Sequence, residues 1–318
     1  MSGFVFALKR LAFAVVLLVV VSILVFSLQS LSTDGMIATI LGGRPGTPEQ
    51  IDAIRLEYRL DDPWTARYGD WLISALQGDL GSSIRSGQSV SGMIVDRLPL
   101  TLGLITFAIV IIVTAGVLMG MLAGIRRGTI ADRLVTMLSL FGLSAPVFVT
   151  GIVLLYVFGV LLGWFPVYGA GTGAFGDRLR HLALPALALA VSLVAIIARQ
   201  TRAVTLTVME QDYITFARSR GLSPARILLR YALRNVALPL VTITGLIVIA
   251  LVSGTVLVEQ VFSIDGLGSL MVRSVQAVDV PVVQGIALVF AVLVVAVNLL
   301  VDLVGMWIDP RTMYTAKG

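Results

Sequence analysis

The sequence has no cysteine and a single histidine, His181, among 318 residues. These absences exclude disulfide bonds, thiolate chemistry and cysteine metal sites, and they leave little for imidazole ligation. Charged residues are also scarce, at 13%, whereas hydrophobic residues reach 58% and the mean hydropathy is +0.99. A soluble domain has roughly 25% charged residues. We therefore expect an all-α polytopic membrane protein and no metal or redox enzyme.

Six segments are long and apolar enough to cross about 30 Å of hydrocarbon. They are residues 11–31, 98–124, 134–163, 182–198, 237–258 and 280–304. The first follows Lys9 and Arg10 as a signal peptide would, but its apolar run is too long for one and no small-x-small cleavage site follows it. We expect an uncleaved first helix and six transmembrane helices in all.

The connecting segments divide into two sets of different charge. Fourteen Lys and Arg residues and four acidic residues lie in the set formed by 1–10, 125–133, 199–236 and 305–318. Nine Lys and Arg residues and thirteen acidic residues lie in the other set, formed by 32–97, 164–181 and 259–279. The positive-inside rule places the first set, with both termini, in the cytoplasm. Orientation thus explains the basic charge, and no nucleic-acid partner is needed.

Residues 32–97 form a long outer segment, which we expect to be a small extracytoplasmic cap on a single transmembrane domain spanning 1–318. Within it, Thr47-Pro-Glu-Gln predicts a helix start with an N-cap and a proline at the first position. Trp64, Tyr68 and Trp71 recur at near-helical spacing. They form either a contact surface for an external partner or, more simply, an interfacial belt or local packing.

Small residues and prolines mark special positions in the spans. Gly116, Gly120 and Gly124 form a small-xxx-small series, which predicts that a helix of this or another chain approaches closely. Ser144-Ala145-Pro146 predicts a kink or local unwinding in the third span, and Pro185 predicts a similar feature in the fourth.

Broken helices at membrane depth are tolerated where they line a cavity. Ser144 and Pro146, at the predicted break, are therefore candidate residues of a translocation pathway. Asn298, a polar residue in the sixth span, is a third candidate.

The segment 199–236 is longer than a simple connection and is predicted to contain two short helices. Glu210 to Asp212 open the first helix, Tyr213, Phe216 and Ala217 form its apolar face, and Gly221 closes it. Ser223 caps the second helix, with Pro224 at its first position. Its basic stripe is Arg226, Arg230 and Arg234, and its apolar face is Ile227, Leu228 and Tyr231.

A basic amphipathic helix can lie on anionic lipid, and this alternative explains the arginines of the stripe. It does not explain the glycine turn between two capped helices. We therefore expect the segment to project from the membrane into a groove on a partner protein.

Several motifs resemble a known family. They are Asp212-Tyr213-Ile214-x-x-Ala217-Arg218-x-x-Gly221-Leu222, Tyr231-Ala232-Leu233-Arg234-Asn235, Leu238-Pro239, Leu60-Asp-Asp-Pro63, Gly78-Asp-Leu-Gly81-x-Ser83, Arg97-Leu-Pro99-x-Thr101-Leu102, Arg178-x-x-His181-Leu-x-Leu-Pro185, Val261-Phe262, Gly266-Leu-Gly268, Asn298-Leu-Leu-Val-Asp302 and Asp309-Pro-Arg311. The first three resemble the cytoplasmic EAA loop of bacterial ABC-importer permeases, and the whole set is similar to the dipeptide, oligopeptide and nickel branch. Thr215 and Phe216 stand where the general motif has Glu and its first Ala, and the distance from Gly221 to Pro239 exceeds that of the general form, as expected of the peptide branch.

The resemblance implies a type I ABC-importer permease of the bacterial cytoplasmic (inner) membrane, which imports di- or oligopeptides or a related small solute. Its implied partners are a second homologous permease, two cytoplasmic ABC ATPases and an extracytoplasmic substrate-binding protein. No G-x-x-x-x-G-K-[ST] run occurs in the sequence, so we expect ATP and Mg²⁺ on the ATPases, no cofactor on this chain and no enzymatic activity of its own. The implied ATPase-coupling residues are Asp212, Tyr213, Phe216, Ala217, Gly221, Leu222, Ser223, Arg226 and Ile227.

Two other functions are compatible with isolated residues. Ser144 with His181 as its base would be an intramembrane serine hydrolase, although the predicted topology separates them. Asn298 and Asp302, one helical turn apart, could form the ion site of a self-contained secondary transporter, although Asp302 lies near the cytoplasmic end of its span.

Overall fold

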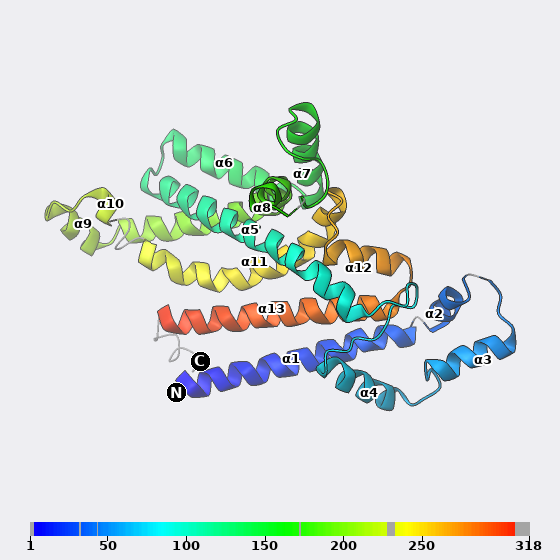
Figure 1. Cartoon of the computed structure of the whole chain (residues 1–318). Helices are drawn as coiled ribbons and strands as arrows, with labels where there is room; N and C mark the ends of the chain where they lie inside the picture. Colours follow the sequence, from blue (N-terminus) through cyan, green and yellow to red (C-terminus); the bar gives the residue numbers. More distant parts are fainter. Residues whose placement is uncertain (1–2, 32, 43, 172, 228–232, 309–318) are drawn as a thin grey trace. The chain divides into compact units, whose positions relative to one another are not determined.

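The computed structural model describes residues 3–31, 33–42, 44–171, 173–227 and 233–308 (Figure 1). These residues form helices joined by turns, and within them the only β-type pairing is an isolated bridge between Ser82 and Ser89. The helices are α1 (Gly3–Leu31), α2 (Thr33–Ile40), α3 (Pro48–Glu57), α4 (Trp64–Leu76), α5 (Val90–Ile125), α6 (Ile130–Ser144), α7 (Val147–Leu154), η1 (Leu155–Leu161, a π-helix), α8 (Phe175–Met209), α9 (Asp212–Ser219), α10 (Pro224–Ile227), α11 (Leu233–Val261), α12 (Leu267–Gln276) and α13 (Val280–Ile308).

Five of the six predicted spans fall within single helices, and the third, 134–163, is divided among α6, α7 and η1. Four helices of the described residues, α1, α5, α8 and α13, are long and apolar enough to cross a membrane, and a fifth candidate is the bent pair of α6 with α7 and η1. In α11 the apolar stretch found among the described residues is shorter, Gly245–Val261. The protein is therefore membrane-spanning, and six transmembrane helices remain a prediction.

The chain divides into two compact units. The first contains Leu102–Ile264 and Val297–Gly318 with the N-terminal Met1–Ala7, and the second contains Leu8–Thr101 and Asp265–Ala296. The long helices α5 and α13 each contribute one part to each unit.

In the first unit, α8 is the central helix and packs against α6, α7 and α11. The glycine face of α5 also lies on α8, because a Cβ atom placed on Gly120 would be 2.5 Å from the carbonyl oxygen of Ala198. A Cβ atom on Gly116 or Gly124 would meet α8 at 2.6 or 2.7 Å. The prediction of close helix packing is confirmed, and the neighbouring helix belongs to this chain.

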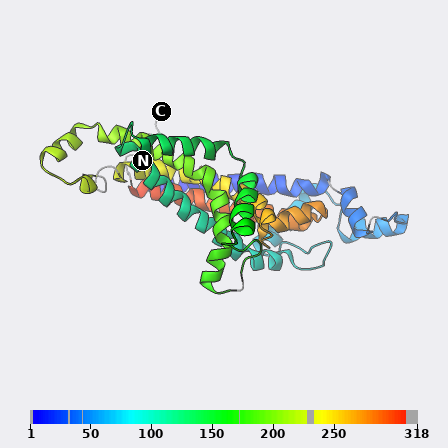
Figure 2. The ribbon, with the colours of Figure 1, turned by 90° about the horizontal axis from the view of Figure 1, so that it is seen from above.

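The third span is broken at the predicted place. Helix α6 ends at Ser144, Ala145 is extended, and Pro146 is the N-cap of α7. The two halves meet at 107°, and Figures 1 and 2 show α7 turning away from the line of α6. Since proline has no N–H to donate, the break falls where the helix would lose a hydrogen bond.

The local unwinding considered at Pro185 does not occur, because α8 is one helix from Phe175 to Met209 with Pro185 inside it. The helix begins before the predicted span, so Pro185 lies well inside it. Its neighbours Leu184 and Ala186 are buried. Packing on the surrounding helices maintains α8 despite the missing backbone donor.

The second unit contains the outer segment and its own apolar core. The core is formed by Val90, Ile94, Leu267, Leu270, Val282 and Ile286. Thr47 is the predicted N-cap of α3, and it forms a capping box with Gln50. The side chains of Trp64, Tyr68 and Trp71 surround Phe26 of α1, with ring centroids 5.5–5.7 Å from it. These aromatic residues therefore have the local packing role.

Candidate functional site

The predicted coupling segment begins as a continuation of α8. This helix extends to Met209, so residues 199–209 are helical rather than part of a loop. Helix α9 follows after a short turn, and both views of the ribbon show α9 and α10 beyond the end of α8 (Figures 1 and 2). The two short helices of the prediction are thus present, on a rigid helical base.

The turn between α9 and α10 has the predicted glycine geometry. Gly221 has a φ of +74°, which glycine adopts at little cost. The Leu222 N–H donates to the Ala217 carbonyl at 3.3 Å, and the Arg220 N–H donates to that of Phe216 at 3.2 Å. These bonds satisfy carbonyl groups at the end of α9.

Helix α9 packs differently from the prediction. Ile214 and Ala217 are buried against Met121 of α5, Val208 of α8 and Ile227 of α10. Ala217 therefore lies on the inner face, whereas Tyr213 and Phe216, which were predicted to share an apolar face with it, are exposed, at 41% and 64%.

The physical reason is the register of this short helix. Ile214 and Ala217 share one face, three residues apart, whereas Tyr213 and Phe216 share the neighbouring face. The Arg220 guanidinium lies 5.8 Å from the centre of the Phe216 ring. The element therefore has a fixed inner face and an exposed aromatic face.

The second short helix begins at the predicted cap. The hydroxyl oxygen of Ser223 accepts a hydrogen bond from the Arg226 N–H at 3.4 Å, and Ile227 is buried. Asp212 and Arg226 are exposed. The rest of the predicted stripe and face, Leu228, Arg230, Tyr231 and the side chain of Arg234, lies outside the described residues, as do the side chains of Leu238-Pro239 and the motif Asp309-Pro-Arg311.

An ion pair that the sequence did not predict joins α8 to α6. Arg202 donates to both carboxylate oxygens of Asp132, at 2.6 and 3.0 Å, and the Gly128 N–H donates to the same carboxylate at 3.0 Å. A second ion pair, between Arg127 and Glu210, measures 2.7 Å. In sequence these residues were only charges in connecting segments. The structure joins them into a brace between α8 and the segment that begins α6, with Glu210 directly before α9.

The three candidate pathway residues lie at two places in the first unit. Ser144 and Pro146 flank the bend, where Ser192 of α8 donates to the Ala145 carbonyl at 3.2 Å. Asn298 lies against α11, because its side-chain oxygen is 2.2 Å from a Cβ atom built on Gly245. Asn298 is thus a contact between α13 and α11.

The hydrolase alternative has no geometric support. The Ser144 hydroxyl donates to the Leu140 carbonyl of its own helix at 3.0 Å. His181 interacts with Asp177 one turn earlier in α8, at 3.3 Å from its carboxylate. No contact between Ser144 and His181 occurs in the part of the chain that the structure describes.

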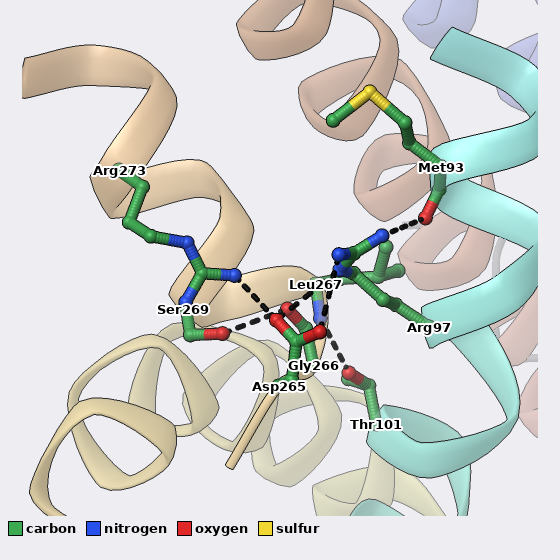
Figure 3. Close-up of polar contacts among 8 residues, drawn as sticks. All are labelled: Met93, Arg97, Thr101, Asp265, Gly266, Leu267, Ser269 and Arg273. Carbon is green, nitrogen blue, oxygen red and sulfur yellow. Dashed lines mark hydrogen bonds and ion pairs between the residues drawn. The ribbon is translucent and has the colours of Figure 1, made fainter. Parts of the chain in front are cut away.

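Two of the family-like motifs meet in the second unit. Figure 3 shows Arg97 of α5 and Arg273 of α12 both paired with the carboxylate of Asp265. Thr101 accepts a hydrogen bond from the Leu267 N–H at 2.9 Å. Burial disfavours the Asp265 carboxylate, but the bonds from Arg273 and Arg97 outweigh this effect and hold its pKa below the ordinary 3.8.

Comparison with known proteins decides the family. The model of the binding-protein-dependent transport system inner membrane component matches residues 116–314, and the N-terminal model of such membrane components matches residues 3–105. The chain belongs to this permease family. The relationship predicted from the motifs is confirmed.

Members of this permease family align with nearly the full length of the chain. A putative peptide transport system permease of Brucella abortus (strain 2308) is 40% identical over 311 residues, covering 96% of this chain and 98% of the relative. A probable peptide ABC transporter permease of Sinorhizobium fredii is 35% identical over 312 residues, covering 98% and 99%. A di/tripeptide transport system permease of Pseudomonas aeruginosa is 34% identical over 328 residues, covering 96% and 98%. The chain is thus a membrane permease component of the peptide ABC-importer group.

Proposed function

We propose that this chain is the transmembrane subunit of an ATP-driven importer that moves di- or oligopeptides across the cytoplasmic membrane by alternating access. Peptide transport is supported by the names of relatives that match almost the whole chain. The proposal includes six spans in the type I fold and cytoplasmic termini, which the charge distribution supports.

The observation that carries the proposal is the construction of α9 and α10. A helix of eight residues, α9, is held by buried Ile214 and Ala217, yet it exposes Tyr213 and Phe216. Exposed aromatic side chains on a fixed support are typical of residues that anchor a protein interface. The partner is a cytoplasmic ABC ATPase whose groove receives this face, with Asp212, Gly221 and the cap of α10 shaping the contact.

The coupling route continues through the first unit. Force on α9 reaches α8 directly, and the Asp132–Arg202 pair links α8 to the start of α6. Helix α6 ends at the bend of Ser144 and Pro146, which would change shape as access alternates. Ser144, Pro146 and Asn298 are proposed to contribute to the pathway or its gating.

The remaining partners follow from membership of a binding-protein-dependent system. A second homologous permease completes the pathway, two ABC ATPases bind ATP and Mg²⁺, and an extracytoplasmic binding protein delivers the substrate. The segment 32–97 is proposed as the extracytoplasmic cap, and 199–236 as the coupling region. This chain binds no cofactor of its own in the proposal.

The test is purification of the tagged chain from its native membrane in mild detergent, combined with peptide uptake by the same cells. We expect a second permease and one or two P-loop ATPases to copurify, and Phe216→Ala to reduce both their recovery and uptake. Phe175→Ala is the matched control, since Phe175 is 80% exposed at the other end of α8. Recovery of the chain alone, with solute movement in liposomes without ATP, would instead establish a secondary transporter.

A further inference from the structure

A hollow of about 570 Å³ lies in the second unit. Its lining includes Arg85 and Ser86 from the loop before α5, and Arg273 and Gln276 from α12. Met93 and Leu270 give it an apolar side. Small-molecule sites of about 300–1,000 Å³ commonly combine apolar walls with a few polar groups, and this hollow has that composition.

The loop that carries Arg85 is held in place by a buried acid. The Ser83 hydroxyl and the Ile84 N–H donate to the two carboxylate oxygens of Asp279, at 2.5 and 3.1 Å. The Ser83 oxygen also accepts the Ser86 N–H at 3.0 Å. Asp279 also lines the hollow, but it is buried and both of its carboxylate oxygens already accept these hydrogen bonds, so it orders the loop and is a poor partner for a ligand.

The remaining charge around the hollow is positive. Arg273 shares the single carboxylate of Asp265 with Arg97, so these three residues carry one net positive charge (Figure 3). Arg85 is exposed, and it forms no ion pair among the described residues. The hollow therefore offers guanidinium donors, with hydroxyl and amide groups beside them, to an anion.

We propose that this hollow binds the terminal carboxylate of a peptide substrate, with Arg85 as its main partner. The proposal rests on the proposed function and on the predicted topology, which places residues 32–97 and 259–279 outside the membrane. Carboxylates are the planar anions that guanidinium groups bind well. Every unmodified linear peptide ends in one, whatever its side chains, so a site of this kind serves varied peptides.

The concave form favours a small solute over a protein surface. A carboxylate of the binding protein has the same chemistry, but a flat acidic surface would leave Met93 and Leu270 without a partner. A peptide can place its carboxylate near Arg85 and an apolar side chain against Met93 and Leu270. The site thereby provides weak, side-chain-tolerant capture before translocation.

The experiment measures binding of alanyl-phenylalanine to the purified full-length permease in lipid nanodiscs, without a binding protein, by ligand-observed NMR. We expect the free dipeptide to bind, and both its C-terminal amide and the Arg85→Gln variant to give binding about tenfold weaker. Arg55→Gln is the matched control, because Arg55 is also an arginine of the second unit and pairs with Asp61 outside the hollow. It should bind the dipeptide as the wild type does.

Equal binding of the acid and the amide, or of wild type and Arg85→Gln, would overturn the proposal. The absence of dipeptide binding to the wild type would also overturn it. If Arg85→Gln then lost affinity for the binding protein, the partner of Arg85 would be an acidic protein surface. Peptide uptake by cells carrying the wild-type protein separates these results from failure of the proposed function. If cells take up peptide normally but the purified permease does not bind the dipeptide, the carboxylate site is contradicted and the proposed function is not.

Discussion

Each unit contains a group of paired carboxylate and guanidinium side chains, but the two groups differ in composition and exposure. They are the Asp132–Arg202 pair of the first unit and the Arg97–Asp265–Arg273 cluster of the second unit. The pair matches one acid with one base, and the Asp132 side chain is only 8% exposed. The cluster gives one acid two bases, and the Asp265 side chain is 60% exposed. A balanced pair with a buried acid and an Arg202 side chain that is 32% exposed fixes two helices, whereas an exposed cluster with an extra arginine keeps donor capacity for another anion.

The energetic consequence also differs. Removing one member of a buried pair leaves an uncompensated charge and costs about 3–5 kcal/mol, whereas exposed pairs contribute about 0–1 kcal/mol. We therefore expect the pair to stabilise the fold and the cluster chiefly to position α5 and α12 around the hollow.

The largest effect is expected for Asp132→Asn. This change removes the charge opposite Arg202, so the free energy of unfolding should fall by about 3 kcal/mol. Thermal unfolding of the detergent-purified protein, followed by tryptophan fluorescence, measures the shift. A smaller loss for Asp132→Asn than for Asp265→Asn would contradict the different roles of the pair and the cluster.

A second change tests whether close helix packing supports the pair. Gly120→Val would place a Cβ atom 2.5 Å from the Ala198 carbonyl oxygen of α8, one turn before Arg202. We expect a loss of about 1–3 kcal/mol from overpacking. Gly176→Val is the control, since its Cβ atom would meet nothing within 4 Å. Equal unfolding temperatures for the two variants would contradict tight packing of α5 on α8.

The smallest effect is expected for Asp265→Asn, at about 1 kcal/mol or less because the cluster is exposed. The lowered pKa of Asp265 means that its carboxylate contributes stability above the ordinary value of 3.8 and loses that contribution as the pH falls through the lowered pKa. The difference between wild type and Asp265→Asn should therefore stay constant from about pH 8 to 5 and shrink only in stronger acid. Unfolding temperatures across this range measure it, and a change near neutral pH would contradict the assignment.

Local signals in the sequence predicted local structure well. The break before Pro146, the positive φ at Gly221 and the N-cap at Thr47 each depend on residues close in the chain. The sequence also predicted that another helix packs closely on the glycine face of α5, because small residues at helical spacing favour such packing.

The sequence could not predict relations that depend on packing. In an eight-residue helix, either Tyr213 or Ile214 could begin the inner face, and only the surrounding α5, α8 and α10 decide between them. Arg97 and Asp265 stand 168 positions apart, and nothing in the sequence around either residue identifies the other as its partner. The brace between Asp132 and Arg202 was missed for the same reason.

The most direct test of the account uses Gly221 in the purified complex with its ATPases. Gly221→Val strains a φ of +74° without a clash, because a Cβ atom there meets nothing within 4 Å. Gly221→Asn is the matched control, since asparagine tolerates this conformation. The measurement is peptide transported per ATP hydrolysed. We expect a strong fall for Gly221→Val and a near-normal ratio for Gly221→Asn, whereas a normal ratio for Gly221→Val would contradict coupling through α9 and α10.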